Sequence, residues 1–368
     1  MQRTSRRRHL TLALVFVALT IGTLALTTGL AQANSGKGMV YTETNATHNA
    51  VLAFDRAANG KLTFKASYDT GGMGGALGTP QGALALSPDG HWLVAVNAGS
   101  NDISLFAVTR WGLIRTDREA AGGMTPASVT ISGNLVYVLD AGGSGNIAGF
   151  TVDRRGKLQA IDGSIQPLSG SATGPAEIKF NAKGNVLVVT ERNTNLIDTY
   201  TVNRKGVASA PTTHTSNGMT PYGFDFTKTG TLVVSEAAAN ALSSYKVGPS
   251  MFTLKSGSVS NGGVGQAPCW VTISDNGSLA FTSDAHTGTI SVYSISASGK
   301  LTLLAGTAAP AVGIPLLDLA LSQGSRYLYG LDIGNGTIDE FRVSWSGALT
   351  LIGSATGIPS TASGLVAQ

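Results

Sequence analysis

The stretch ALALSPDGHWLVAVNAGSNDISLFAVTRWGLIRTDREA, residues 83–120, decides the fold, because it contains four short β-forming runs in succession. Val, Ile, Leu and aromatic residues alternate with polar ones inside the runs, and Gly, Asn, Asp and Pro stand between them. This pattern is typical of short strands joined by tight turns. The expected strands cover residues 83–87, 91–97, 102–108 and 113–120.

The same plan recurs at a nearly constant interval. Six prolines each precede an alternating apolar run, at successive spacings of 46, 49, 46, 47 and 47 residues. They are Pro80, Pro126, Pro175, Pro221, Pro268 and Pro315. The tetrapeptide GMTP even occurs twice, at residues 123–126 and 218–221. A period of roughly 20–50 residues indicates a repeat architecture, and four strands per period indicate the blade of a β-propeller.

The remaining units predict an all-β, seven-bladed β-propeller with four antiparallel strands per blade. Second strands are expected at 39–43, 135–140, 186–191, 231–236, 279–284 and 327–332, and third strands at 50–55, 147–152, 196–202, 241–247, 289–295 and 337–343. The first unit lacks an inner strand, while the chain ends in GLVA at 364–367. We therefore expect the C-terminal strand to complete the N-terminal blade and close the ring, which removes two open sheet edges. A single domain is predicted at 39–368, after a linker at 34–38.

The positive charge of the chain is concentrated at its N-terminus. Arg3, Arg6, Arg7 and Arg8 account for the formal net charge of +4, and the first 33 residues contain no Asp or Glu. The rest of the sequence has equal numbers of basic and acidic residues. No nucleic-acid partner is therefore expected.

Residues 1–33 have the layout of a secretory signal peptide. An Arg-rich start precedes an apolar stretch and an A-x-A cleavage pattern, Ala31-Gln32-Ala33, as such signals require. The start also partly resembles a twin-arginine signal. We expect a secreted, periplasmic or cell-surface monomer, exported by a Sec- or Tat-type route and without a membrane span after cleavage. An uncleaved N-terminal anchor is the alternative, because the apolar stretch is long enough to span a bilayer.

The only cysteine, Cys269, excludes an intramolecular disulfide. It begins an apolar strand, and no neighbouring His or Lys would lower its pKa, so a buried structural thiol is expected rather than a nucleophile.

Six of the seven second strands end in a carboxylate. The seven positions are Glu43, Asn97, Asp140, Glu191, Glu236, Asp284 and Asp332. One interpretation is an acidic ring around the central opening that could hold a divalent cation through oxygen ligands. The other is that each acid accepts backbone N–H bonds of its own turn. The second fits better, because a site should single out one or two blades. No metal ligands and no cofactor are therefore assigned.

Two histidines and one charged pair complete the candidates. His48 and His286 lie on turns of the same class, where either could act as a general base. Lys179 and Asp225 occupy equivalent inner-strand positions in adjacent blades, which predicts an ion pair near the tunnel. Glu177, Trp270 and Asp318 are expected on the same rim.

The whole chain after the leader resembles the seven-bladed lactonase-type propellers, which include the propeller form of 6-phosphogluconolactonase and the fungal carboxymuconate cyclase. The resemblance is carried by residues 87–108, 220–237, 274–295 and 357–367. It implies a catalytic Arg and His after a Gly-Pro in the middle blade, with a Glu ending the next strand. This chain has Gly174, Pro175 and Glu191, but Ala176 and Glu177 replace the Arg and His.

Two functions follow from the resemblance and from this departure. The first is an exported hydrolase of a sugar or aromatic-acid lactone, with Glu191 as base and Arg192 or His286 as its polarising partner. The expected ligand-binding residues are Glu177, Glu236, Trp270, Asp284 and His48. The second is a non-catalytic envelope propeller that binds a lactone, a carbohydrate-derived ligand or an envelope protein.

Overall fold

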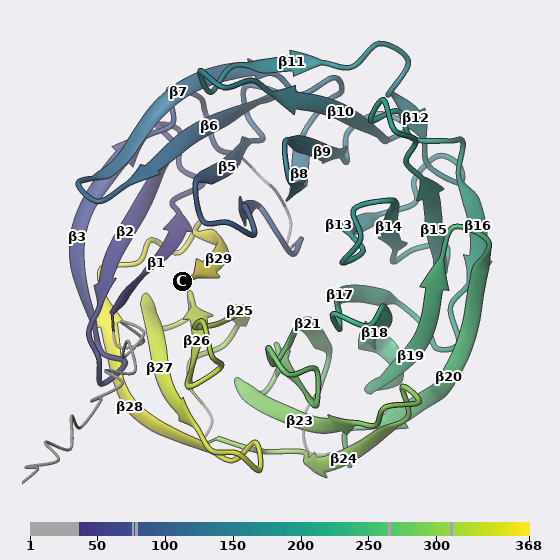
Figure 1. Cartoon of the computed structure of the whole chain (residues 1–368). Coiled ribbons are helices and arrows are strands. Elements are labelled where there is room, and N and C mark those ends of the chain that lie inside the picture. Colours follow the sequence, from purple (N-terminus) through teal and green to yellow (C-terminus); the bar gives the residue numbers. More distant parts are fainter. Residues whose placement is uncertain (1–36, 76, 78–79, 264–265, 310–311) are drawn as a thin grey trace, which may run out of the picture. The chain divides into compact units, whose positions relative to one another are not determined.

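The computed structural model describes residues 37–75, 77, 80–263, 266–309 and 312–368. Residues 35–368 form one compact unit, in which seven antiparallel sheets surround a central axis as the blades of a ring (Figure 1). The predicted signal peptide, its cleavage site and most of the linker lie outside the described residues. Among the residues described, no helix is long and apolar enough to cross a membrane.

Each blade is an up-and-down sheet. From the innermost strand outward, blade one contains β29 (Ser363–Ala367), β1 (Gly38–Glu43), β2 (Ala50–Arg56) and β3 (Leu62–Asp69). Blade two contains β4 (Leu84–Leu86), β5 (Trp92–Asn97), β6 (Asp102–Thr109) and β7 (Gly112–Ala120), and blade three β8 (Pro126–Ser132), β9 (Leu135–Asp140), β10 (Asn146–Val152), β11 (Leu158–Ala160) and β12 (Gln166–Pro167).

The other four blades continue this order around the ring. Blade four contains β13 (Pro175–Phe180), β14 (Val186–Glu191), β15 (Leu196–Thr201) and β16 (Thr212–Thr215), and blade five β17 (Pro221–Phe226), β18 (Thr231–Glu236), the 3-10 turn η1 (Ala237–Ala239), β19 (Ala241–Gly248) and β20 (Met251–Ser260). Blade six contains β21 (Pro268–Ile273), β22 (Leu279–Asp284), β23 (Thr289–Ile295) and β24 (Leu301–Ala305), and blade seven β25 (Leu316–Leu321), β26 (Tyr327–Asp332), β27 (Thr337–Val343) and β28 (Leu349–Thr356).

The predicted closure of the ring is confirmed. Strand β29 pairs antiparallel with β1, with Tyr41 opposite Val366. The pairing extends to Gln368, whose backbone N–H donates to the Met39 carbonyl at 2.8 Å and whose carbonyl accepts from Arg56. Both chain ends of the ring thus share one sheet, and the N-terminal blade has no open inner edge.

Blade three differs from the expected four strands, because its outer strand is interrupted. β11 and β12 both pair with β10, at opposite ends of it. Between them, Ser164 Oγ accepts from Gly149 N–H at 3.0 Å and donates to the Gly149 carbonyl at 3.1 Å, replacing the missing ladder bonds. This insertion accounts for the longest spacing between prolines, 49 residues.

The second strands form the core, and most of their side chains are buried on both faces, as in β18 and β22. Large side chains fill the space between neighbouring blades, including Tyr41, Tyr137, Phe224, Phe281 and Phe341. Burying a side chain of this size contributes about 2 kcal/mol. No intramolecular disulfide adds to this packing, because the single cysteine, Cys269, is free.

The turns of one blade hold the start of the next. In three places an Asn with positive φ accepts a hydrogen bond from the residue that precedes the next inner strand: Asn101 from Thr125 at 2.7 Å, Asn195 from Thr220 at 2.6 Å and Asn240 from Ala267 at 2.9 Å. Asn tolerates this left-handed conformation better than most residues. Both GMTP segments therefore place their Thr at this junction between blades.

The repeated strand order gives the ring two distinct faces. We call upper the face with the turns between second and third strands and the connections between blades. The lower face has the turns between first and second strands and between third and fourth strands. Because every blade runs in the same direction, Pro175 pairs with Glu191 at the upper face, as Pro221 does with Glu236.

One segment leaves the blades and lies across the ring axis. Figure 1 shows the chain before β4 extending towards the centre. This segment, residues 80–82, contacts four other blades there. For example, Gln81 N–H donates to the Ala176 carbonyl at 3.0 Å, and the Gly82 carbonyl accepts from Val129 N–H at 2.8 Å. This crossing segment, residues 80–82, lies between an upper pocket and a lower cavity.

Candidate functional site

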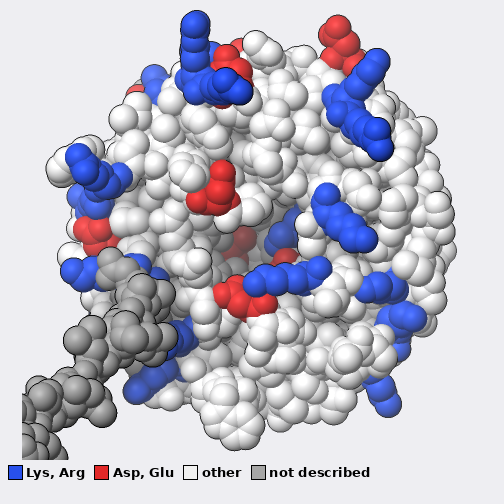
Figure 2. Space-filling view, in the orientation of Figure 1, with Lys and Arg blue, Asp and Glu red and all other residues white. Residues whose placement is uncertain are grey.

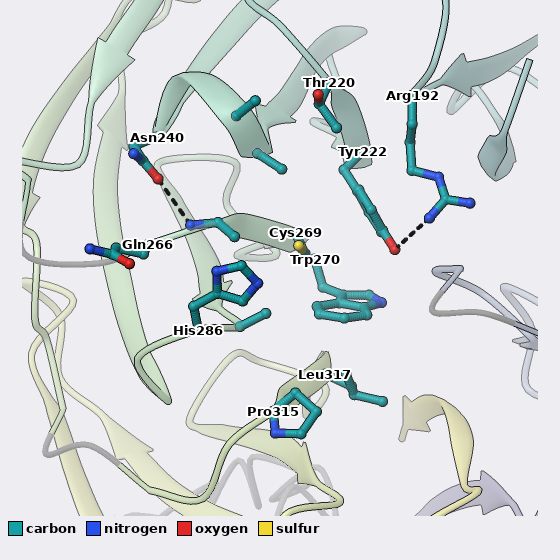
Figure 3. Close-up of a pocket in the computed structure, with 14 residues that line it drawn as sticks. Arg192, Thr220, Tyr222, Asn240, Gln266, Cys269, Trp270, His286, Pro315 and Leu317 are labelled. Atoms are coloured by element: carbon teal, nitrogen blue, oxygen red, sulfur yellow. Dashed lines mark hydrogen bonds between the residues drawn. The ribbon is translucent and has the colours of Figure 1, made fainter.

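A pocket of about 560 Å³ opens on the upper face over blades four to seven. Its floor is apolar and includes Cys269, Trp270, Ala285 and Leu317, which come from the inner strands of blades six and seven and the β22–β23 turn. Polar side chains stand around the rim: Arg192, Thr220, Tyr222, Asn240, Gln266 and His286 (Figure 3). A concave apolar site with a few polar groups is the usual form of a small-molecule site.

Trp270 forms the centre of the floor because the crossing segment supports it from below. Its indole Nε1 donates to the Pro80 carbonyl at 3.4 Å, and the side chain is 1% exposed. The Tyr222 ring packs against it with centroids 5.7 Å apart and a tilt of 59°. The two rings thus provide a fixed aromatic surface under any ligand in the pocket.

Among the described residues that line the pocket, Arg192 is the only one with a charged side chain. Its Nε donates to the Gly174 carbonyl at 3.0 Å, and one terminal N–H donates to Tyr222 Oη at 3.1 Å. The guanidinium lies 5.0 Å from the Tyr222 ring centroid, within cation–π range. These contacts hold the guanidinium in place and leave further N–H donors for a ligand oxygen.

His286 stands on the opposite side of Trp270 from Arg192 (Figure 3). It belongs to the turn between β22 and β23, its side chain is exposed, and its backbone N–H donates to Gln266 at 3.2 Å. An exposed imidazole at a pocket rim can take up or release a proton during a reaction. The pocket therefore presents a cation and a base on either side of an aromatic floor.

Cys269 lines the same floor, but it is not an activated nucleophile. Burial raises the pKa of its thiol to about 12, despite the opposing charge of Arg192. The residue is 7% exposed. The predicted burial of this thiol is therefore confirmed.

The predicted carboxylates Glu191, Glu236 and Asp284 have no exposed surface and do not line the pocket. Glu191 accepts from Ser169 N–H at 3.0 Å and from the hydroxyls of Ser169 and Thr194. Glu236 accepts from Gly218 N–H at 2.7 Å and from Ser258 Oγ at 2.6 Å.

Asp284 likewise accepts from Asn261 and Ser291, and burial raises its pKa to about 6. These strand-end acids therefore hold the connections that lead into their blades, and their buried carboxylates do not form an exposed acidic ring at the opening. Among the residues that the structure describes, no His, Cys, Asp or Glu side chains group together in a way that could hold a metal ion.

The predicted ion pair is confirmed below the crossing segment. Lys179 Nζ lies 2.8 Å from Asp225 Oδ1. Burial alone would lower the pKa of Lys179, but the charges of Asp225 and Glu177 outweigh it and raise the pKa. Glu177 accepts from Phe224 N–H at 2.6 Å and lines the lower cavity. The expected common rim of Glu177, Trp270 and Asp318 is correct for Glu177 and Asp318, which both line the lower cavity. It was wrong for Trp270, which lines the upper pocket.

The structure thus brings together Arg192, His286 and Trp270 of the predicted site residues. His48 is exposed on an upper turn of blade one and does not line the pocket. Sequence reasoning missed Thr220, Tyr222, Asn240 and Gln266. Thr220 and Tyr222 flank Pro221 of the second GMTP segment, so the repeat signal marked their place on the upper face but not their part in the pocket.

The chain matches the family described as "Lactonase, 7-bladed beta-propeller" over residues 34–170 and 163–261. Comparison with curated protein sequences gives no match. Solved structures are similar in fold. A Lactobacillus plantarum protein shares 17% identity at a TM-score of 0.74, covering 90% of this chain and 99% of its own.

Two further similar structures have an activity in their descriptions. A Bacteroides fragilis protein, a candidate 6-phosphogluconolactonase, shares 16% identity at a TM-score of 0.72, covering 91% of this chain and 99% of its own. A periplasmic gluconolactonase of Pseudomonas aeruginosa shares 13% identity at a TM-score of 0.70, covering 89% and 98%. At these identities the likeness shows the fold alone.

Proposed function

Because the chain belongs to the lactonase family of seven-bladed β-propellers, we propose that it hydrolyses a small lactone in the upper pocket. The observation that carries this proposal is the placement of Arg192 and His286 on either side of the Trp270 floor. Ester hydrolysis needs a cation for the developing oxyanion and a base for water, and this pocket offers both.

The lactone ring would lie on Trp270 with its carbonyl oxygen towards Arg192. His286 would take a proton from a water molecule as that water attacks the carbonyl carbon. Arg192 would stabilise the tetrahedral oxyanion. As the carbonyl re-forms, the bond to the ring oxygen breaks and the protonated His286 returns its proton to that oxygen. One water is consumed, and the product is an open-chain hydroxy acid.

The pocket lining favours a lactone with at most one negative charge. Arg192 is its only charged side chain, and the floor is apolar. A sugar lactone without phosphate or an aromatic-acid lactone fits this lining, because a ring face can stack on Trp270. A doubly charged sugar phosphate would have only one cation to pair with.

Arg192 would take the role that the family pattern assigns to an Arg after the Gly-Pro. Position 176 is Ala and position 177 is Glu in this chain. Arg192 reaches back to the Gly174 carbonyl at 3.0 Å, so its guanidinium lies close to the place where the missing Arg would begin. Glu191 would then be a structural residue that holds the preceding loop through Ser169.

We also propose that the protein is exported. The support is the signal-like pattern of residues 1–33, together with the name of the Pseudomonas aeruginosa protein, a periplasmic gluconolactonase. Export would place the pocket where unphosphorylated lactones rather than cytosolic sugar phosphates occur. Fractionation of cells that express the full chain tests this directly.

A second candidate is ligand binding without turnover. It is favoured by one observation: the strand-end carboxylates closest in sequence to the pocket residues, Glu191 and Asp284, are fully buried and hydrogen-bonded, so neither of these acids can assist His286. In this case the pocket would hold an intact lactone or a hydroxy acid.

Proton release against a panel of lactones separates the two candidates. Unphosphorylated sugar lactones and aromatic-acid lactones should be opened, and a 6-phosphorylated lactone should be a poorer substrate. Binding of the same compounds is followed by quenching of the protein's tryptophan fluorescence, to which Trp270 contributes. Quenching without proton release on any lactone would reject hydrolysis and support binding alone.

A further inference from the structure

The charged residues of the ring are distributed unequally between its two faces. The turns of the lower face contain eleven Lys or Arg and three Asp. The basic residues are Lys61, Arg110, Arg154, Arg155, Lys157, Lys183, Arg204, Lys205, Lys228, Lys300 and Arg326, and all of them are exposed. The turns and connections of the upper face contain only Arg192 and Asp162.

Burial of the acids explains why the overall charge count hides this asymmetry. Twelve of the 21 Asp and Glu residues are buried, Glu191, Asp198 and Asp284 among them, whereas Arg56 is the only buried basic residue of the described chain. Equal numbers of acids and bases after the leader therefore leave a positive surface. Figure 2 shows Lys and Arg side chains spread around one face, where acidic side chains are fewer.

Two exposed tryptophans share the lower face with these charges. Trp345 is 94% exposed in the β27–β28 turn, and Trp111 is 77% exposed in the β6–β7 turn. Arg110 lies over the Trp111 ring at 4.6 Å. Tryptophan is rarely this exposed without a function, and the two positions flank blade one from either side.

We propose that the lower face binds the surface of a bilayer that contains anionic lipids. Lys and Arg near such a surface are attracted to anionic headgroups, and Trp side chains prefer the level of the headgroups, where the ring is buried and the N–H stays hydrated. In this orientation the lower face lies against the lipid. The upper pocket faces away from it and stays open to solvent.

The distribution of the groups favours a lipid surface over a nucleic acid. The basic residues occur on turns of all seven blades, from Lys61 in blade one to Arg326 in blade seven, and so cover a broad face. Single-stranded nucleic acid is bound by a basic groove with successive aromatic platforms. Here Trp111 and Trp345 stand on separate turns two blades apart.

Vesicle co-sedimentation tests the proposal. The protein is residues 35–368, which contain all seven blades and the closing strand. We expect binding to vesicles of phosphatidylglycerol and phosphatidylcholine, weak binding to phosphatidylcholine alone, and a loss of binding in high salt. Brominated lipids should quench the fluorescence of the bound protein.

Matched double variants identify the face. Trp111→Ala with Trp345→Ala should reduce the partition coefficient about tenfold and abolish the quenching. Met124→Ala with Met219→Ala, on exposed residues of the upper face, should leave both unchanged. Charge reversal at Arg154, Arg155, Arg204 and Lys205 should also reduce binding about tenfold.

Three results would overturn the proposal. One is equal binding by both double variants. Another is equal binding to neutral and anionic vesicles. The third is tight binding to a soluble polyanion such as heparin with none to vesicles, which would assign the face to a polymer. Circular dichroism of each variant separates lost binding from lost folding.

Discussion

Gln81 of blade two forms two hydrogen bonds with the backbone of Val271 in blade six, across the centre of the ring. Its Nε2 donates to the Val271 carbonyl at 2.9 Å, and its Oε1 accepts from Val271 N–H at 2.9 Å. One side chain thus satisfies two backbone groups of an inner strand edge. It also supports the floor of the upper pocket beside Trp270.

Gln81→Ala should destabilise the protein by about 2 kcal/mol, because it leaves both backbone groups of Val271 buried without their partner. Chemical denaturation measures this change. Gly223→Ala should also destabilise the protein, since a Cβ on Gly223 would overlap both Gln81 Oε1 and the backbone carbonyl of Cys269. An unchanged free energy of unfolding in both variants would show that the crossing contributes nothing to stability.

The Lys179–Asp225 pair should show a coupling of about 1–2 kcal/mol in a double-mutant cycle. Lys179→Met leaves Asp225 and Glu177 without their cation, and Asp225→Asn removes the anion closest to Lys179. The losses of stability of the two single variants should therefore add up to more than the loss of the double variant. Denaturation of the four proteins at one pH gives the coupling. Strictly additive losses would contradict the pairing.

Asp198 makes stability depend on pH. It is fully buried, and burial, followed by the charge of the neighbouring Glu191, raises its pKa to about 7. The folded state therefore holds a proton that the unfolded chain releases near pH 4, and stability should fall as pH rises from about 4 to about 7.

Asp198→Ser should make this fall smaller and stabilise the protein by about 2 kcal/mol at pH 8. Serine suits the position, because Ser243 and Ser291 occupy it in blades five and six. Thermal unfolding between pH 4 and pH 8 gives the comparison. A variant with the same pH profile as the wild type would assign the dependence to other acids.

Cys269 should react with iodoacetamide about a thousandfold more slowly in the folded protein than after unfolding, at pH 8. The reason is its pKa of about 12, which lowers the thiolate fraction by about three powers of ten. Mass spectrometry follows the single alkylation. Rapid labelling of the native protein would mean that the thiol is ionised and could take part in chemistry.

Most of the fold could be predicted because each blade repeats the same local pattern. Strands such as Leu135–Asp140 and Val186–Glu191 have the bounds that alternation and turn residues predicted. Ring closure followed from the missing inner strand. The crossing by Gln81 could not be predicted, because it departs from the repeat and joins residues 190 positions apart.

The candidate site was only partly predictable. A strand-end acid such as Glu191 can face the opening or its own loop, and the sequence is the same in both cases. Only the position of Ser169 decides between them. The excess of Lys and Arg on the lower face could not be predicted from composition either, because composition counts buried and exposed acids alike.

The rate of proton release from an unphosphorylated sugar or aromatic-acid lactone at pH 7 tests the central claim most directly. Wild-type protein should turn over, and Arg192→Gln and His286→Gln should each lose about a hundredfold in rate. His48→Gln, a variant at an exposed histidine of another upper turn, should keep the wild-type rate. Equal rates in all four proteins would contradict a site in the upper pocket.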